Sequence, residues 1–249
     1  MRTKMTSRFT TMRMLPPVAD RHLYFEGHQV DVEFYEFPSQ RQKFIANIPE
    51  RLLQLFTPSV ANCVEQDSLT NSMKLRIRVA SLEQADEVEV LALKQVFQHM
   101  SNLMQSDSPC TDLPLWTTVK EGVRLYRAYQ MLHLYTAAED TRAALMHLMK
   151  TNPLDSLDVE TLWHAFGPSG DWFNTMLHNL AYFYATNNLP DHDYIFWYLD
   201  NELLQLTDVQ RSSILYQYEA HKGLAKRESR GMPKVKAFLK QPLGIRVAN

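Results

Sequence analysis

A strand that runs directly into a short helix constrains the fold of this chain more than any other part of its sequence. The segment 44–60 begins with alternating apolar and polar residues, which is typical of a half-buried strand, and then reaches Pro49. Proline suits the first turn of a helix, because the N–H that it lacks has no helical partner there. Three apolar residues then share one helical face before Thr57-Pro58 ends the helix. With an apolar strand expected at 73–79, this order predicts the first half of a small α+β domain.

Two further stretches predict the remaining strands of a sheet that is covered on one side only. Residues 30–37 alternate apolar and polar side chains, and residues 42–45 can return beside them after a turn. Met73–Val79 has an apolar residue at every second position and basic residues between them. One face of this strand must meet water, so we expect a sheet with one open face and 73–79 at or near its centre.

From about residue 86 onward, apolar residues recur at helical spacing, so the second half of the chain is expected to be helical throughout. Residues 136–139 have the pattern of a capping box, and Asp158 and Asp171 are candidate N-caps of later helices. A wholly helical repeat scaffold is the alternative fold, but no fixed repeat period is recognised in the sequence. The expected class is therefore α+β, with a small sheet flanked by helices and an all-helical C-terminal half.

Charge is segregated along the chain, although its net value is only −2. Residues 1–21 carry a net +4 and residues 221–249 a net +7, so the body between them carries −13. The first arm resembles a mitochondrial presequence in composition, and the tail could be a nuclear signal, a weak nucleic-acid contact or simply a mobile end. We expect both ends to be dispensable for folding and the protein to be nuclear or cytoplasmic, with mitochondrial import less favoured. No apolar run is long enough to cross a membrane.

The sequence predicts no catalytic residue, no cofactor and no metal site. Cys63 and Cys110 do not make a disulfide framework, which favours a reducing compartment. His192-Asp193 with His178 lacks a third ligand at helical spacing. Motifs of serine hydrolases, zinc proteases and phosphate-binding loops are absent from the sequence. An enzyme whose site is assembled from distant residues stays an alternative, because such groups meet only in the fold.

The residues from 30 to 150 resemble a BTB/POZ domain, in the divergent form of filamentous-fungal proteins. The stretch from Ile48-Pro49-Glu50 to Phe56-Thr57-Pro58-Ser59 is similar to the family's strand–helix element, and Met73–Val79 to its middle strand. The segments 90–100 and 123–134 are similar to the helices that follow. Asn47 stands near the place of the family's usual histidine, which is a departure from the pattern.

The resemblance implies a non-enzymatic module for protein–protein interaction, and a transcription-related regulatory scaffold is the expected function. Family members also serve as substrate adaptors of cullin ubiquitin ligases, and Val64 and Glu65 are the candidate residues for such a contact. The expected partners are other proteins, and a homodimer and a monomer both stay open. The chain would comprise four parts: a basic flexible arm (1–21), the BTB/POZ-like domain (22–150), a helical extension (151–220) and a basic flexible tail (221–249).

An aromatic cluster at 194–198 is too dense for one buried face of a helix. It is explained either by a thick helical core or by an exposed aromatic interaction surface, because Tyr and Trp are common anchors of interfaces. Tyr194, Trp197 and Tyr198 are therefore candidate interaction residues.

Overall fold

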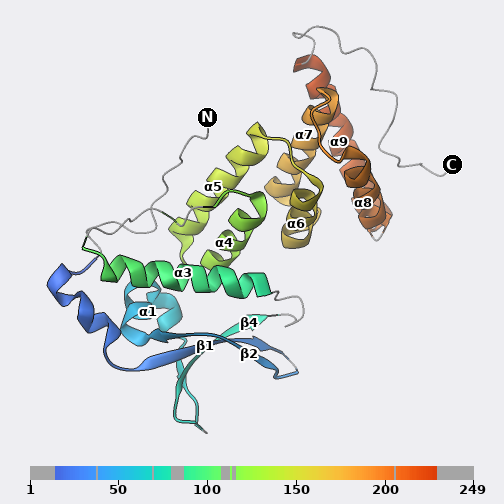
Figure 1. The fold of residues 1–249 in the computed structure, drawn as a ribbon. Helices are drawn as coiled ribbons and strands as arrows, with labels where there is room; N and C mark the ends of the chain where they lie inside the picture. The colour runs from blue at the N-terminus through green and yellow to red at the C-terminus, as the bar shows by residue number, and fades with distance from the viewer. Residues whose placement is uncertain are drawn as a thin grey trace. The chain divides into compact units, whose positions relative to one another are not determined.

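The alternating segments of the first half form a four-stranded sheet in the computed structural model, in the order β2-β1-β4-β3 (Figure 1). β1 (Gln29–Glu36) pairs antiparallel with β2 (Gln42–Pro49) and parallel with β4 (Met73–Val79). β3 (Glu65–Gln66) pairs antiparallel with the start of β4. β4 is therefore an internal strand, as its sequence pattern predicts. The short β3 was not predicted, because its two residues carry no periodic pattern.

The structure describes residues 15–37, 39–68, 70–79, 87–107, 113, 116–204 and 206–228. The basic arm as far as residue 14, the tail from residue 229 and Cys110 lie outside these residues. The chain divides into two compact units. The first takes in the residues up to Thr117 together with Arg124–Ala144, and the second takes in Thr118–Val123 together with the residues from Leu145 onward. The expected α+β class is confirmed, since a small sheet with flanking helices precedes a helical second half.

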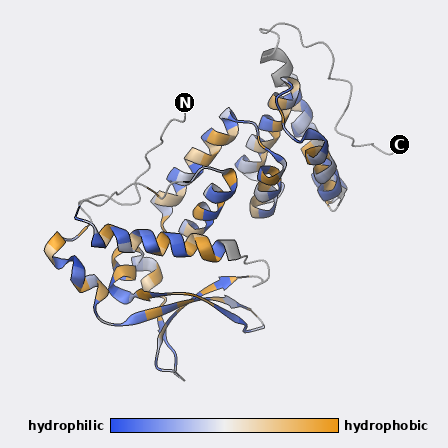
Figure 2. Ribbon diagram, in the orientation of Figure 1, coloured by the Kyte–Doolittle hydropathy of each residue, from blue (hydrophilic) through white to orange (hydrophobic). Residues whose placement is uncertain are grey.

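The first unit buries one face of its sheet. In the parallel pair, Val32 lies beside Leu75 and Phe34 beside Ile77, and all four side chains are buried. α1 (Glu50–Phe56) and α3 (Glu87–Gln105) lie on the same side of the sheet (Figure 1). Hydrophilic and hydrophobic stretches alternate along α3, as expected for a helix with one buried face (Figure 2). The 3-10 helix η2 (Val18–Phe25) and α2 (Pro58–Ala61) complete this unit's regular elements up to α3.

Ion pairs lie along β1 and β4 between the residues of the buried face. Glu33 of β1 is only 6 % exposed and accepts a hydrogen bond of 3.0 Å from Nε of Arg76 on β4. Lys74 and Arg76 also pair with Asp67, at 3.1 Å and 3.3 Å. The basic residues that alternate with the apolar ones in β4 thus neutralise acidic neighbours within the sheet.

Two segments expected to be flexible are more ordered than predicted. Arg21 is buried in η2 and donates hydrogen bonds to the carbonyl oxygens of Pro16 and Ser106, so the arm is part of the fold from residue 15. α9 (Asp208–Glu228) continues through residues 221–228, which were expected to belong to the tail. These residues carry helix-compatible side chains, and His221 has a ring contact with His178 of α7.

The predicted caps were also partly wrong. α5 (Tyr135–Thr151) already includes Thr136, so residues 136–139 form no box before it. α6 (Ser156–Phe166) is capped by Asp155, whose side chain accepts from the N–H of Asp158, while Asp158 is the reciprocal third residue. α7 (Gly170–Ala185) begins before Asp171, which therefore is not its cap. A cap is set by where the first turn begins, and apolar spacing leaves that uncertain by a few residues.

Three pairs of consecutive helices, which we call hairpins, follow one another in the sequence with nearly constant spacing: α4 (Val119–Met131) with α5, α6 with α7, and α8 (His192–Leu204) with α9. The residues that precede their first helices are Thr118, Asp155 and Asp191, 37 and 36 residues apart. Thr118 and Asp155 each accept a hydrogen bond from the N–H three residues later. The buried β-branched residues Val123, Val159 and Ile195 recur at intervals of 36. A repeat period therefore exists in the helical part, although it was not recognised in the sequence.

Two of the helix ends have the same geometry. His133 after α4 and Asn187 after α7 have positive φ angles of 55° and 57°. The next N–H in each case returns to the carbonyl oxygen five residues back, which satisfies a free carbonyl of the last turn. His133 is exposed there.

Within the second unit, α7 packs along α9, and α6 lies beside both α7 and α8. Asn179, 2 % exposed, connects α7 to the segment before α6. Its side-chain amide donates to the carbonyl oxygens of Met149 and Asn152 and accepts from the N–H of Leu154 at 3.2 Å. The core includes Val159, Leu162, Phe173, Met176, Leu177, Leu180, Ile195 and Leu199.

Candidate docking surface on α6 and α8

α6 and α8, the first helices of the second and third hairpins, run side by side in the same direction. Residues further along α6 form hydrogen bonds with residues further along α8. Four hydrogen-bonded pairs connect the helices and the residue before α8. They are Ser156–Asp191 (3.3 Å), Glu160–Tyr194 (2.8 Å), His164–Tyr198 (3.4 Å) and Trp163–Glu202 (2.8 Å). Such polar contacts hold the two helices in register above the apolar core.

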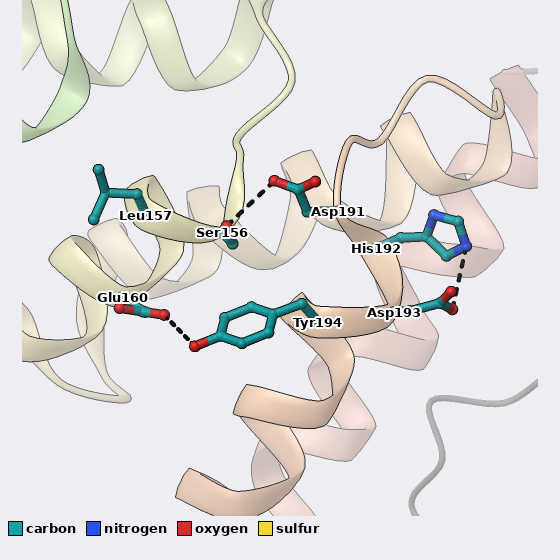
Figure 3. A pocket seen from close by; sticks show the side chains of 7 residues that line it. All are labelled: Ser156, Leu157, Glu160, Asp191, His192, Asp193 and Tyr194. Carbon is teal, nitrogen blue, oxygen red and sulfur yellow. Dashed lines mark hydrogen bonds and ion pairs between the residues drawn. The ribbon is translucent and has the colours of Figure 1, made fainter.

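An open pocket of about 660 Å³ lies between the starts of α6 and α8 (Figure 3). The ring of Tyr194 spans the space between the helices, and its hydroxyl reaches Glu160 (Figure 3). The pocket is lined by Ser156, Leu157, Glu160, Asp191, His192, Asp193 and Tyr194.

Large apolar side chains are exposed at this pocket and next to it. Leu157 is 50 % exposed, Tyr194 47 % and Trp197 60 %. The rings of Tyr194 and Trp197 lie 5.5 Å apart, so they form a continuous aromatic patch on α8. Exposed Trp and Tyr that lie together are a common feature of binding sites. We call Leu157, Glu160, Asp193, Tyr194 and Trp197 the α6–α8 surface.

The stretch of sequence that contains this surface carries charges of a single sign. No Lys or Arg occurs in the sequence between Lys150 and Arg211, whereas nine Asp and Glu residues do, so this stretch has a formal charge of −9. Most of the negative charge of the body is therefore concentrated in α6, α7, α8 and their connections. A field of one sign favours ligands of the opposite charge.

Helix capping explains only part of this charge. Asp155 and Asp158 form the capping box of α6, and burial, followed by the negative charge of Asp155, raises the pKa of Asp158 from 3.8 to about 6. Asp193, by contrast, has a side chain that is 94 % exposed, and its neighbour at 3.4 Å is His192. A negative charge close to the start of a helix is stabilised by the helix dipole, but this does not require so open a position.

The geometry of the pocket does not resemble that of a nucleophile with its base. Ser156 donates to the carboxylate of Asp191, while His192 pairs with the different carboxylate of Asp193. Nucleophilic catalysis by serine would need the histidine within hydrogen-bond distance of the hydroxyl. In the described ranges, no three His, Cys, Asp or Glu side chains gather as metal ligands. His178, which was considered with His192, contacts the ring of His221 instead.

The structure brings together some of the predicted interaction residues and separates others. Tyr194 and Trp197 are adjacent and exposed, whereas Tyr198 is partly buried with its hydroxyl toward His164. Val64 and Glu65 belong to the first unit, where Val64 is half-buried and Glu65 lies 3.7 Å from Arg76.

Sequence reasoning missed the contribution of α6, namely Leu157 and Glu160. The signal that could have indicated this region is the long stretch without Lys or Arg, which includes both α6 and α8.

Comparison of the chain with protein-family models, with curated proteins and with solved structures gave no match. In the part of the chain that the structure describes, no helix is both long and apolar enough to span a membrane.

Proposed function

We propose that this chain is a non-enzymatic protein that binds other proteins through the α6–α8 surface. The observation that supports this most is the exposed pair Tyr194 and Trp197, held in register with α6 by the bond from Tyr194 to Glu160. Helical hairpins that stack in sequence commonly bind protein segments along their aligned first helices. A transcription-related regulatory scaffold, nuclear or cytoplasmic, is the role we favour for such a protein.

The BTB/POZ resemblance supports the same class of function for the first unit. A cullin-ligase adaptor remains the alternative function, and its contact would include Val64 and Glu65. Glu65 is compatible with such a contact because its side chain is 74 % exposed. An enzyme with a site assembled from distant residues is the alternative from another class.

Capture of partners on the immobilised full chain tests the proposal. We expect stoichiometric partners from a native extract with the wild-type chain and their loss with Trp197→Ala. Removal of a central aromatic anchor costs about 2 kcal/mol, roughly thirtyfold in Kd. Tyr216→Ala is the matched control, because Tyr216 is an aromatic residue of the same unit that is 78 % exposed but lies on α9. Equal capture by Trp197→Ala and wild type would refute the proposed surface.

A further inference from the structure

We infer that residues 229–249 of this chain bind to the α6–α8 surface and compete there with other protein segments. The inference rests on the proposed function, because it concerns the regulation of the same surface. Three observations support it: the exposed apolar side chains of the surface, the opposite charges of the two parts, and the length of the segment.

The exposed apolar side chains provide the first argument. Leu157, Tyr194 and Trp197 offer both an aliphatic and an aromatic contact beside an open pocket. Residues 229–249 contain apolar side chains that can fill such a pocket, among them Phe238 and Leu243. Burial of a large apolar side chain contributes roughly 1.5–3 kcal/mol.

Charge complementarity provides the second argument. Residues 229–249 carry five Lys or Arg and no Asp or Glu, so their formal charge is +5. The stretch 151–210, which contains the α6–α8 surface, has a formal charge of −9. Glu160 and Asp193 are the two acidic residues of the surface. Each lies within three positions in the sequence of one of its exposed apolar side chains. The segment therefore combines the two properties that the surface selects, apolar side chains and positive charge.

The length of the segment provides the third argument. Tyr184 of α7 has ring contacts with His192 and Phe196 at the start of α8, at 5.7 Å and 5.0 Å. His178 of α7 meets His221 of α9 at 5.3 Å, and α9 ends at Glu228. At 1.5 Å per residue, the six residues from His178 to Tyr184 and the seven from His221 to Glu228 place the end of α9 at most about 20 Å along the helices from the start of α8. The 21 residues after Glu228 can span up to about 70 Å, which is ample for a return to this surface.

Photo-crosslinking of the full chain tests the inference. Benzoylphenylalanine replaces Trp197 in one sample and Tyr216 in the control, and mass spectrometry identifies the crosslinked peptides after irradiation. Tyr216 is nearer to residues 229–249 in sequence and more exposed than Trp197, so a crosslink from it reports random encounters with these residues. We expect position 197 to crosslink to residues 229–249 several-fold more than position 216 does. Equal yields, or no crosslink from position 197 to this segment, would overturn the inference.

A charge reversal provides the second readout. Asp193→Lys should reduce the crosslink from position 197 several-fold, and added salt should reduce it in the wild-type background. Asp208→Lys is the matched control, because Asp208 is 97 % exposed and lies at the start of α9, outside the surface. Circular dichroism of each variant establishes that it is folded. An unchanged crosslink in folded Asp193→Lys would contradict a contact driven by charge.

The two proposals fail separately. Loss of captured partners with Trp197→Ala, without crosslinks to residues 229–249, would retain the proposed function and overturn the inference. A crosslinked product of about the 29.0 kDa chain mass would place the segment on its own surface. A product of twice that mass would place it on a second copy, and both products support the segment as the occupant.

Discussion

The indole Nε1 of Trp163 donates a hydrogen bond of 2.8 Å to Oε2 of Glu202, which joins the end of α6 to the end of α8. Trp163 is buried, so Glu202→Ala would leave its N–H without this acceptor. We expect this variant to lower the free energy of unfolding by about 1–3 kcal/mol. Glu202→Gln keeps an acceptor oxygen and should lose clearly less. Urea unfolding of both variants tests this expectation, and equal losses would show that the bond contributes little.

The three hydrogen bonds of Asn179 predict a larger effect. Asn179→Leu would remove the amide that pairs with two carbonyl oxygens and one N–H in a buried place. Each buried polar group left unpaired costs about 1–3 kcal/mol, so we expect a loss of several kcal/mol or failure to fold. Asn179→Asp tests the donor alone, because it keeps the shape but has no N–H. Asn174→Asp on the exposed face of the same helix is the control and should change stability little.

The raised pKa of Asp158 predicts that stability decreases as the pH rises. The carboxyl has a pKa of about 6 in the fold and 3.8 ordinarily, so the folded chain binds more protons than the unfolded chain between these values. This group's contribution is therefore complete below about pH 4 and is lost as the pH rises through about 6. Asp158→Asn should be more stable than wild type above pH 6 and similar at pH 4. Urea midpoints across this range measure the difference, and parallel curves for the two proteins would contradict it.

His221 should have the opposite pH dependence. Burial, followed by the nearby charge of His178, lowers the pKa of His221 below 6.5, so the unfolded chain binds the proton more readily. Stability from this group is present above pH 6.5 and is lost as the pH falls through the lower folded value. His221→Gln should therefore lessen the loss of stability on acidification. His147→Gln, at an exposed position on α5, is the control and should retain the wild-type loss.

Arg21 provides a test in the first unit. Its guanidinium donates to the carbonyl oxygens of Pro16 and Ser106, which lie far apart in the sequence. We expect Arg21→Ala to lower the free energy of unfolding by about 1–3 kcal/mol, since both carbonyls lose a charged donor. Deletion of residues 1–14 should leave the melting temperature within a few degrees, as a change below about 1 kcal/mol does. Equal effects of the two changes would show that Arg21 does not anchor the arm.

The elements of the first unit could be predicted because their signals are local. The alternation in Met73–Val79 and the turn from Pro49 into α1 depend on a few consecutive residues, and both occur as expected. Arg21 shows the limit of such reasoning. Its place in the fold depends on a carbonyl 85 residues away, and composition alone assigned it to a flexible arm.

The candidate site was predictable on one helix and not on the other. The density of aromatic residues at 194–198 indicated Tyr194 and Trp197, because one helix has too few buried positions for all of them. Leu157 and Glu160 join them only because α6 and α8 lie in register. The regular spacing of the hairpins in the sequence indicates this register. Only a few side chains, such as Val123, Val159 and Ile195, repeat with that spacing.

The recurring hairpins also determine how the second unit can open. In a row of hairpins each one contacts mainly its sequence neighbours, so folding can begin in one hairpin and spread to the next. Among the described residues, the hairpin of α8 and α9 contacts the hairpin before it, with α9 packed along α7 and α8 beside α6. The α6–α8 surface includes residues of both this hairpin and the one before it. A ligand bound there contacts both hairpins, so it must dissociate before the last hairpin can separate from the one before it. Its binding free energy therefore adds to the free energy needed for that separation.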